Sequence, residues 1–156
     1  MFVGVKNVWV NPVDGVDEGY ISGSFDEPFQ TINYAMGMIY PTETNPITIN
    51  LTEGTFSPGS NGESFPIVFN SHIILNGQGE DVTILNAEAD SENNTSVIQQ
   101  GWDNYGMSIS NLTISGGEDF FGGGINFSHG DPNLTNIIIR DNIAYMNGGG
   151  INFSDG

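Results

Sequence analysis

A nine-residue motif occurs twice in this chain, and the distance between its copies constrains the fold more than any other feature. Gly122–Gly130 reads GGGINFSHG, and Gly148–Gly156 reads GGGINFSDG, 26 positions later. A second pair of segments, Ile109–Ile114 and Leu134–Ile139, matches at an offset of 25. Because two different strand-like segments share nearly one period, each period is expected to form one coil of a solenoid.

Matched side chains of neighbouring coils should lie above one another at the strand spacing of about 4.8 Å. Ile125 then stacks on Ile151, and Phe127 stacks on Phe153, as alternate inward-facing residues. The other stacked pairs expected are Leu112 with Ile137, Ile114 with Ile139, and Asn111 with Asn136, the last as an amide ladder at a corner of the coil.

Short β-branched runs separated by Gly, Asn and Asp extend this pattern toward the N-terminus. A β-sandwich also has short strands and turns, but it does not require one motif at a fixed period. The Leu and Asn spacing of a leucine-rich repeat is absent. The sequence therefore predicts an all-β parallel β-helix. Its earlier strands are expected at residues 5–10, Ile47–Leu51, Ile67–Phe69, Ile73–Leu75, Val82–Leu85 and Val97–Gln99, with a protruding loop at 88–95.

One amphipathic helix is expected ahead of the coils, at residues 27–39, with Asp26 as its N-cap and Pro28 in its first turn. Such a helix would close the N-terminal end of the solenoid, which otherwise exposes apolar side chains and strand edges. We therefore divide the chain into residues 1–46, with the first strand, an acidic loop and the capping helix, and residues 47–156, with the coils. The apolar face of the helix consists of Phe29, Ile32, Met36 and Ile39.

Two segments resemble a known family. Gly23–Ala35, GSFDEPFQTINYA, is similar to the capping segment of bacterial pectin-lyase-like β-helix proteins, and Ile47–Phe56, ITINLTEGTF, resembles the strand and turn that begin their first coil. The resemblance implies a right-handed parallel β-helix and the N-terminal part of a secreted bacterial surface protein. An extracellular or cell-surface location is the corresponding expectation, although the first residues here do not form a signal peptide.

The charge balance excludes several classes of partner. The chain has 2 Lys plus Arg against 19 Asp plus Glu, a formal net charge of −17. Nucleic-acid binding requires a basic surface, which two basic residues cannot provide. No apolar run approaches the ~20 residues of a membrane-spanning helix, so membrane insertion is not expected. The absence of cysteine excludes disulfides and thiolate metal sites.

Aromatic residues between the expected strands provide the first functional hypothesis. Trp102, Tyr105 and Tyr145, together with Phe120 and Phe121, are expected in turns or loops, where aromatic faces could stack on sugar rings. Sealing of coil corners is the alternative role for these side chains. The first hypothesis is a non-catalytic β-helix module of a secreted or cell-surface protein, used for adhesion or glycan contact.

The pectin-lyase-like resemblance implies a second hypothesis, a polysaccharide lyase or glycoside hydrolase. Arg140 with Asp141 and His129 with Asp155 are its candidate catalytic residues, and surface ion pairs are the alternative explanation for both pairs. Anionic polyuronates normally need several cationic contacts, which this composition does not offer. An enzyme should show a groove with clustered carboxylates and Arg140, whereas a structural module should show stacked Asn, Thr and Ile.

Two further expectations concern ligands and assembly. Asp14, Asp17 and Glu18 offer closely spaced oxygen ligands for Ca²⁺, with a solvated acidic loop as the alternative. No capping pattern follows Ile151 and Phe153, so the last coil is expected to be uncapped and the chain to be a fragment. A homodimer through that end is the predicted assembly.

Overall fold

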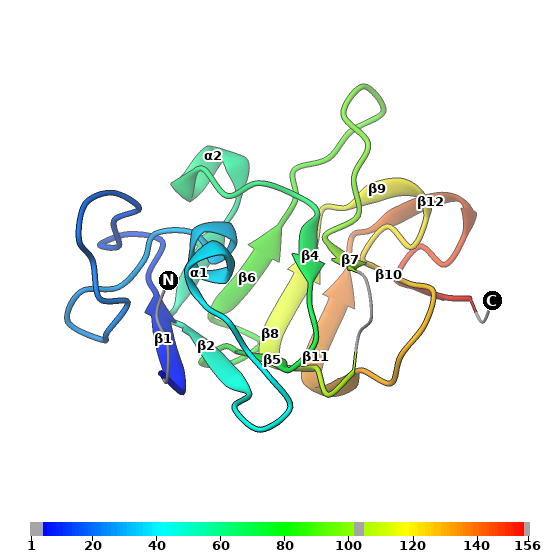
Figure 1. Cartoon of the computed structure of the whole chain (residues 1–156). Helices are drawn as coiled ribbons and strands as arrows, with labels where there is room; N and C mark the ends of the chain where they lie inside the picture. Colours follow the sequence, from blue (N-terminus) through cyan, green and yellow to red (C-terminus); the bar gives the residue numbers. More distant parts are fainter. Residues whose placement is uncertain (1–4, 102–104, 155–156) are drawn as a thin grey trace.

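The computed structural model describes residues 5–101 and 105–154, which form successive coils of a parallel solenoid (Figure 1). All pairings between its strands are parallel, which rules out the antiparallel β-sandwich. The elements are β1 (Asn7–Val10), α1 (Ile32–Met38), β2 (Ile47–Leu51), β3 (Gly54–Phe56), α2 (Pro58–Asn61), β4 (Ile67–Phe69), β5 (Ile73–Asn76), β6 (Thr83–Asn86), β7 (Ile98–Gln100), β8 (Ser108–Ser115), β9 (Glu118–Phe121), β10 (Ile125–Phe127), β11 (Asn133–Arg140), β12 (Ile143–Asn147) and β13 (Ile151–Phe153).

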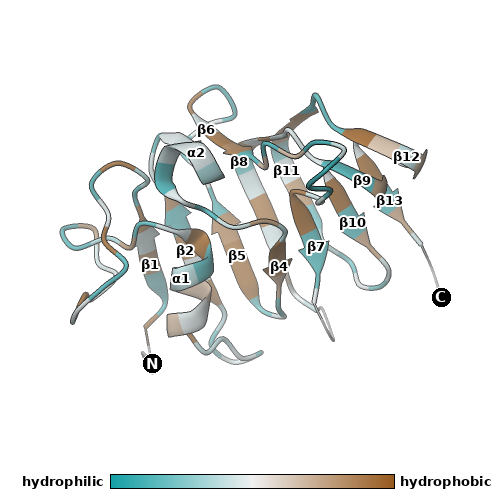
Figure 2. Cartoon of the chain, turned by 90° about the horizontal axis from the view of Figure 1, so that it is seen from above, coloured by the Kyte–Doolittle hydropathy of each residue, from teal (hydrophilic) through white to brown (hydrophobic). Residues whose placement is uncertain are grey.

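Each coil contributes strands to separate faces of the solenoid. The first coil contains β2, β3 and β4, the second β5, β6 and β7, the third β8, β9 and β10, and the fourth β11, β12 and β13. The long strands β8 and β11 run along two faces, so β8 pairs with both β5 and β6. A separate sheet is formed by β4, β7, β10 and β13, which lie side by side in that order (Figure 2). The arrangement is a right-handed parallel β-helix, as predicted.

The repeated motif stacks in register, as the sequence predicts. Ile125 pairs with Ile151 and Phe127 with Phe153, and the two phenyl ring centroids are 5.9 Å apart. In β8 and β11, Leu112 pairs with Ile137. The period of 25 to 26 residues is therefore the length of one coil.

Inward-facing side chains form one continuous apolar column. Each buried aliphatic or aromatic side chain contributes about 1.5–3 kcal/mol relative to exposure. The strands alternate between buried and partly exposed residues, as β2 does with the pattern buried, intermediate, buried, intermediate, buried. The largest side chains with less than 2% exposure are Phe29, Phe56, Phe69, Phe127, Ile32, Ile47, Ile49, Leu51, Ile67, Ile73, Leu75 and Leu85.

An asparagine ladder marks the corner within the long strands and confirms the predicted amide stacking. Asn111 and Asn136 have φ angles of 57° and 50°, in the left-handed region that Asn tolerates better than most residues. Nδ2 of Asn136 donates to Oδ1 of Asn111 at 3.0 Å, and Nδ2 of Asn111 donates to Oδ1 of Asn76 at 2.9 Å. Longer contacts of 3.5 and 3.4 Å continue the series to Asn50 and Asn7. The ladder thus fixes the bend of each coil to that of its neighbour.

The capping helix is shorter than predicted. It begins at Ile32 rather than at residue 27, and its N-cap is Thr31, whose Oγ1 accepts from the Tyr34 backbone N–H at 3.2 Å. The prediction of Asp26 as N-cap was therefore wrong. Phe29 instead bridges Val10 in parallel, so the buried phenyl ring is held by extended backbone. Phe29 fits the apolar spacing of the helix because its side chain packs in the same core. Its backbone, however, is extended rather than helical.

Two carboxylates hold the start of α1. The Asp17 carboxylate accepts from the backbone N–H of Gln30 at 2.7 Å and from Thr31 Oγ1 at 2.6 Å. The Glu63 carboxylate, 2% exposed, accepts from the backbone N–H of Ile32 at 2.6 Å and from Asn33 Nδ2 at 2.8 Å. Burial raises the pKa of Glu63, and the hydrogen bonds from residues 32–33 and Ser64 oppose that shift.

The two ends of the solenoid differ. At the N-terminal end, β1 pairs with β2, and Gly23 and Phe29 bond to the other edge of β1 through the backbone of Trp9. The solenoid therefore begins at β1, inside the segment that we assigned to residues 1–46. At the other end, Ile151 and Phe153 are 41% and 49% exposed. No helix in the described part of the chain is long and apolar enough to cross a membrane.

Substitution of Asn111 tests the ladder. Asn111→Gly removes the side-chain hydrogen bonds but tolerates the positive φ, whereas Asn111→Ala removes the bonds and adds about 1–2 kcal/mol of backbone strain. We expect Asn111→Ala to be the less stable variant by about 1 kcal/mol, the reverse of the usual order of Ala and Gly. Urea denaturation of both variants measures the difference. Equal stability, or a more stable Ala variant, would contradict the left-handed corner.

The buried Glu63 predicts a specific dependence of stability on pH. Its pKa is raised in the folded state, so the folded protein binds this proton more tightly than the unfolded chain. The stabilisation is complete below the ordinary Glu pKa and is lost as pH rises through the folded-state pKa. Relative to Glu63→Gln, the wild type should lose unfolding free energy as the pH rises from the ordinary Glu pKa through the raised folded-state pKa. Denaturant unfolding of both proteins across this range checks the sign, and a relative gain with pH would refute it.

Candidate functional site

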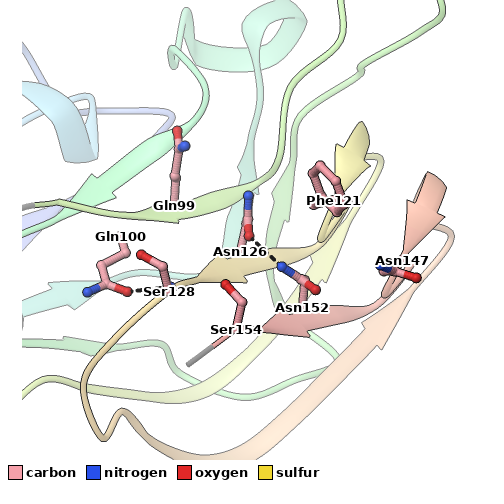
Figure 3. A pocket seen from close by; sticks show the side chains of 8 residues that line it. All are labelled: Gln99, Gln100, Phe121, Asn126, Ser128, Asn147, Asn152 and Ser154. Carbon is pink, nitrogen blue, oxygen red and sulfur yellow. Dashed lines mark hydrogen bonds between the residues drawn. The ribbon is translucent and has the colours of Figure 1, made fainter. Parts of the chain in front are cut away.

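A hollow of about 430 Å³ lies on the outer side of the sheet that contains β7, β10 and β13 (Figure 3). We call it the amide pocket. Gln99, Asn126 and Asn152 occupy neighbouring positions on adjacent strands and project from the same face. The full lining consists of Gln99, Gln100, Phe121, Asn126, Ser128, Asn147, Asn152 and Ser154.

The repeat explains why amides gather there. In each Ile-Asn-Phe segment, the Ile and Phe side chains lie on the core side of the strand. The asparagine between them therefore points outward. Nδ2 of Asn152 donates to Oδ1 of Asn126 at 3.0 Å, which aligns the two amides (Figure 3). One end of the polar row is therefore fixed by the same in-register stacking that builds the core.

The neighbouring sheet supplies one wall of the pocket. Phe121 in β9 pairs with Asn147 in β12, and both line the hollow. The chain then turns sharply at Gly122, where φ is 62° and an added Cβ would lie 2.4 Å from the backbone oxygen of Ile125. A glycine is needed at this corner to bring the aromatic wall next to the amide row.

Part of the hydrogen-bonding capacity of the lining is already used. Oε1 of Gln100 accepts from the backbone N–H groups of Ser128 and His129 at 2.6 and 2.7 Å. These two bonds fix the position of the Gln100 side chain. The pocket thus combines held amides with two hydroxyl groups, on Ser128 and Ser154.

The described residues that line the pocket carry no ionisable side chain, in a chain with 19 Asp plus Glu. Amides and hydroxyls both donate and accept hydrogen bonds without a fixed charge. Phe121, 40% exposed, adds one accessible aromatic ring. The arrangement can bind a neutral, hydroxyl-rich molecule, and the described lining contains no carboxylate, imidazole or amine that could act as a general acid or base.

The aromatic residues proposed to stack on sugar rings do not all lie at the pocket. Phe120 and Phe121 lie in β9 and Tyr145 in β12, so their prediction as turn or loop residues was wrong. Most side chains of these two strands are partly or fully exposed, so the alternating burial that reveals a strand in sequence is missing. Of the aromatic residues proposed, Phe121 lines the amide pocket; Tyr105 does not, and Trp102 lies outside the described residues.

Tyr145 belongs to a separate surface cluster. Its ring lies 5.6 Å from that of Phe120, measured between centroids, and its hydroxyl donates to the Glu118 carboxylate. This hydrogen bond is the main cause of the raised pKa of Tyr145. The cluster links β9 to β12 through side-chain contacts. Such contacts are expected of residues that seal a corner of the coil, which is the alternative role for these aromatic side chains.

Of the candidate catalytic residues, Arg140, Asp141 and His129 do not line the pocket. Arg140 forms an ion pair with Asp141 at 2.5 Å, with both side chains more than half exposed. His129 is exposed and bonds to Gln100 through its backbone N–H. Asp155, its predicted neighbour, lies outside the described residues.

The predicted Ca²⁺ ligands are divided between two roles. Asp17 bonds to the chain just before α1, whereas Asp14 and Glu18 line a hollow of about 390 Å³ near the N-terminal end. Asp26 and Glu27 lie on the same hollow. In the described part of the chain no three His, Cys, Asp or Glu residues are grouped so as to hold a metal ion. Calcium binding stays a prediction of the sequence.

Parallel coils of this kind, with a capped N-terminal end, form a right-handed parallel β-helix of the pectin-lyase-like fold. A family model described as "Protein of unknown function (DUF1565)" matches residues 13–81, which cover the capping segment and the first coil. Among solved structures, the chain is similar to pectin methylesterase PemA from Erwinia chrysanthemi, with a TM-score of 0.64 and 14% sequence identity. The alignment covers 97% of this chain but 46% of that enzyme, and at this identity the likeness is one of fold. No curated protein matches the sequence.

Proposed function

We propose that this chain is a non-catalytic β-helix module that binds a neutral glycan in the amide pocket, outside the cell. The observation that carries the proposal is the uncharged lining of the pocket. The eight described lining residues are five with side-chain amides, two serines and one phenylalanine. In a chain of net charge −17, a polar surface without carboxylates is the part best suited to a ligand other than a cation.

The chemistry of the lining matches that of a sugar. Sugar hydroxyls donate and accept, and so do the side chains of Asn126, Asn152 and Ser128. The Phe121 ring can pack against the C–H face of a pyranose, which is apolar. Because Asn126 and Asn152 are held by their mutual hydrogen bond, little side-chain entropy is lost when a ligand binds.

The enzymatic alternative lacks a matching arrangement in the described residues. A lyase or hydrolase of this fold would need an acid or base beside its substrate, and the pocket lining has none. The paired Arg140 and Asp141 lie at the end of β11 and do not line the pocket. The pectin methylesterase resembles this chain in fold, and its chemistry does not transfer at 14% identity.

Calorimetric titration with soluble oligosaccharides tests the proposal. We expect uncharged oligosaccharides, such as xylo-, manno- or cello-oligomers, to include a binder, and oligogalacturonate to bind far more weakly because both molecules are anionic. Gln99→Ala should weaken binding about fivefold, as loss of one hydrogen bond would. Gln78→Ala is the matched control, since Gln78 is also an exposed glutamine but lies in the turn after β5.

Two outcomes would overturn this function. One is the absence of heat and of affinity-gel retardation with every neutral glycan tested. The other is glycan cleavage or ester release by the purified chain, which would favour the enzymatic alternative.

A further inference from the structure

One peptide bond of the chain differs chemically from all the others, the bond between Asp131 and Pro132. Pro132 is the only one of the seven prolines that follows an aspartate. An aspartate carboxylate can attack the carbonyl carbon of its own residue, because the product is a five-membered ring. Proline favours the break that follows, since its nitrogen belongs to a tertiary amide and carries no hydrogen. This bond is therefore the one in the chain that is best suited to break without a protease.

The bond lies in a bend between β10 and β11, and the fold holds this bend on both sides. Before the bond, Oε1 of Gln100 accepts from two successive backbone N–H groups at 2.6 and 2.7 Å. After the bond, the backbone N–H of Asn133 donates to the carbonyl oxygen of Met107 at 3.0 Å. Gly130 turns the chain between these anchors with a φ of 94°, a conformation that favours glycine. His129 and the aspartate thus lie on the two sides of one glycine, inside a bend with fixed ends.

The side chains on both sides of this glycine are available for chemistry. Asp131 and His129 are exposed, and in the described part of the chain neither side chain forms a hydrogen bond or an ion pair. The loop packed beside them, between β7 and β8, contributes Tyr105 as its titratable side chain within the described residues, and tyrosine is neutral in mild acid. Histidine gains a proton in mildly acid solution, where aspartate is still ionised. A nucleophile and a proton donor are then present in the same bend.

From these observations we infer that the chain cleaves itself between Asp131 and Pro132 in mild acid, with the Asp131 carboxylate as nucleophile and the His129 imidazolium as proton donor. A carboxylate oxygen of Asp131 bonds to the carbonyl carbon of the same residue, and the C–N bond to Pro132 breaks. The proline nitrogen leaves as an amine with the proton from His129. One water then opens the cyclic anhydride to two carboxyl groups, and His129 regains its proton from the solvent. The attack is intramolecular, so no protease or cofactor is required.

The cleaved chain stays assembled, because strand pairing joins the two segments. β11 begins at Asn133, one residue after the new N-terminus, and pairs in parallel with β8 as far as Arg140. β13 pairs with β10 in the same way. Self-cleavage therefore yields two segments, residues 1–131 and 132–156, that remain one particle until they are denatured.

Incubation of the purified chain in mild acid, followed by denaturing gel electrophoresis and mass spectrometry, tests the inference. We expect the two segments to appear at least about tenfold faster at pH 5 than at pH 8, and to elute together from a size-exclusion column without denaturant. Asp131→Asn and Pro132→Ala should remain intact over the same period. His129→Gln should cleave about a hundredfold more slowly at pH 5, as loss of a general acid would cause. Asp141→Asn is the matched control, since Asp141 is also exposed but follows β11, and it should cleave like the wild type.

Glu27→Asp separates this site from the general acid sensitivity of aspartate–proline bonds. The substitution creates a second such bond, before Pro28, where Phe25 rather than a histidine stands two residues earlier. That bond should stay intact at pH 5 while the bond before Pro132 breaks. Equal cleavage of both bonds, an intact wild type at pH 5, or an unchanged rate in His129→Gln would overturn the inference. All of these measurements are made without a glycan, so they are independent of the proposed function.

Discussion

In-register stacking of parallel strands is the interaction on which the rest of this structure depends. A single coil is too thin to bury its own apolar residues, so each coil is stable only when the next one covers it. Stacking places like side chains above one another, and Phe127 against Phe153 is the plainest example. The same geometry orders polar groups, which form the asparagine ladder at the corner and the amide row on the outer face.

The first and last strands of the stack differ in what covers them. At the N-terminal end, the segment before α1 bonds to β1, and Asp17 and Glu63 hold the start of the helix. Burial of Glu63 is tolerable because several hydrogen-bond donors surround its carboxylate. In β13, by contrast, Ile151 and Phe153 are 41% and 49% exposed.

Much of the fold could be predicted because a solenoid repeats its signals. The copies of Ile-Asn-Phe predict the period, the register and the orientation of Asn126 and Asn152. The start of α1 could not be predicted in the same way. Phe29 satisfies a helical spacing, but hydrogen bonding to Trp9 holds it in extended backbone, and that contact is non-local.

The candidate site was harder to predict than the fold. Asn126 and Asn152 were expected to face outward, yet nothing in their local sequence indicated a pocket. The hollow exists because the corner at Gly122 brings Phe121 and Asn147 beside them, and such an arrangement depends on how whole coils are placed. The aromatic residues were a poor guide to the location of the pocket, since of those in the described part of the chain only Phe121 lines it.

The side-chain amide signals of the protein offer the most direct test of the central claim, which is that stacked amides on the outer face bind a neutral glycan. Titration of ¹⁵N-labelled protein with a neutral oligosaccharide should shift the Gln99, Asn126 and Asn152 side-chain resonances. The ladder amides of Asn76 and Asn111, on a different face, should stay in place. Shifts confined to the ladder or to the acidic N-terminal loop, with the pocket amides unmoved, would contradict the account.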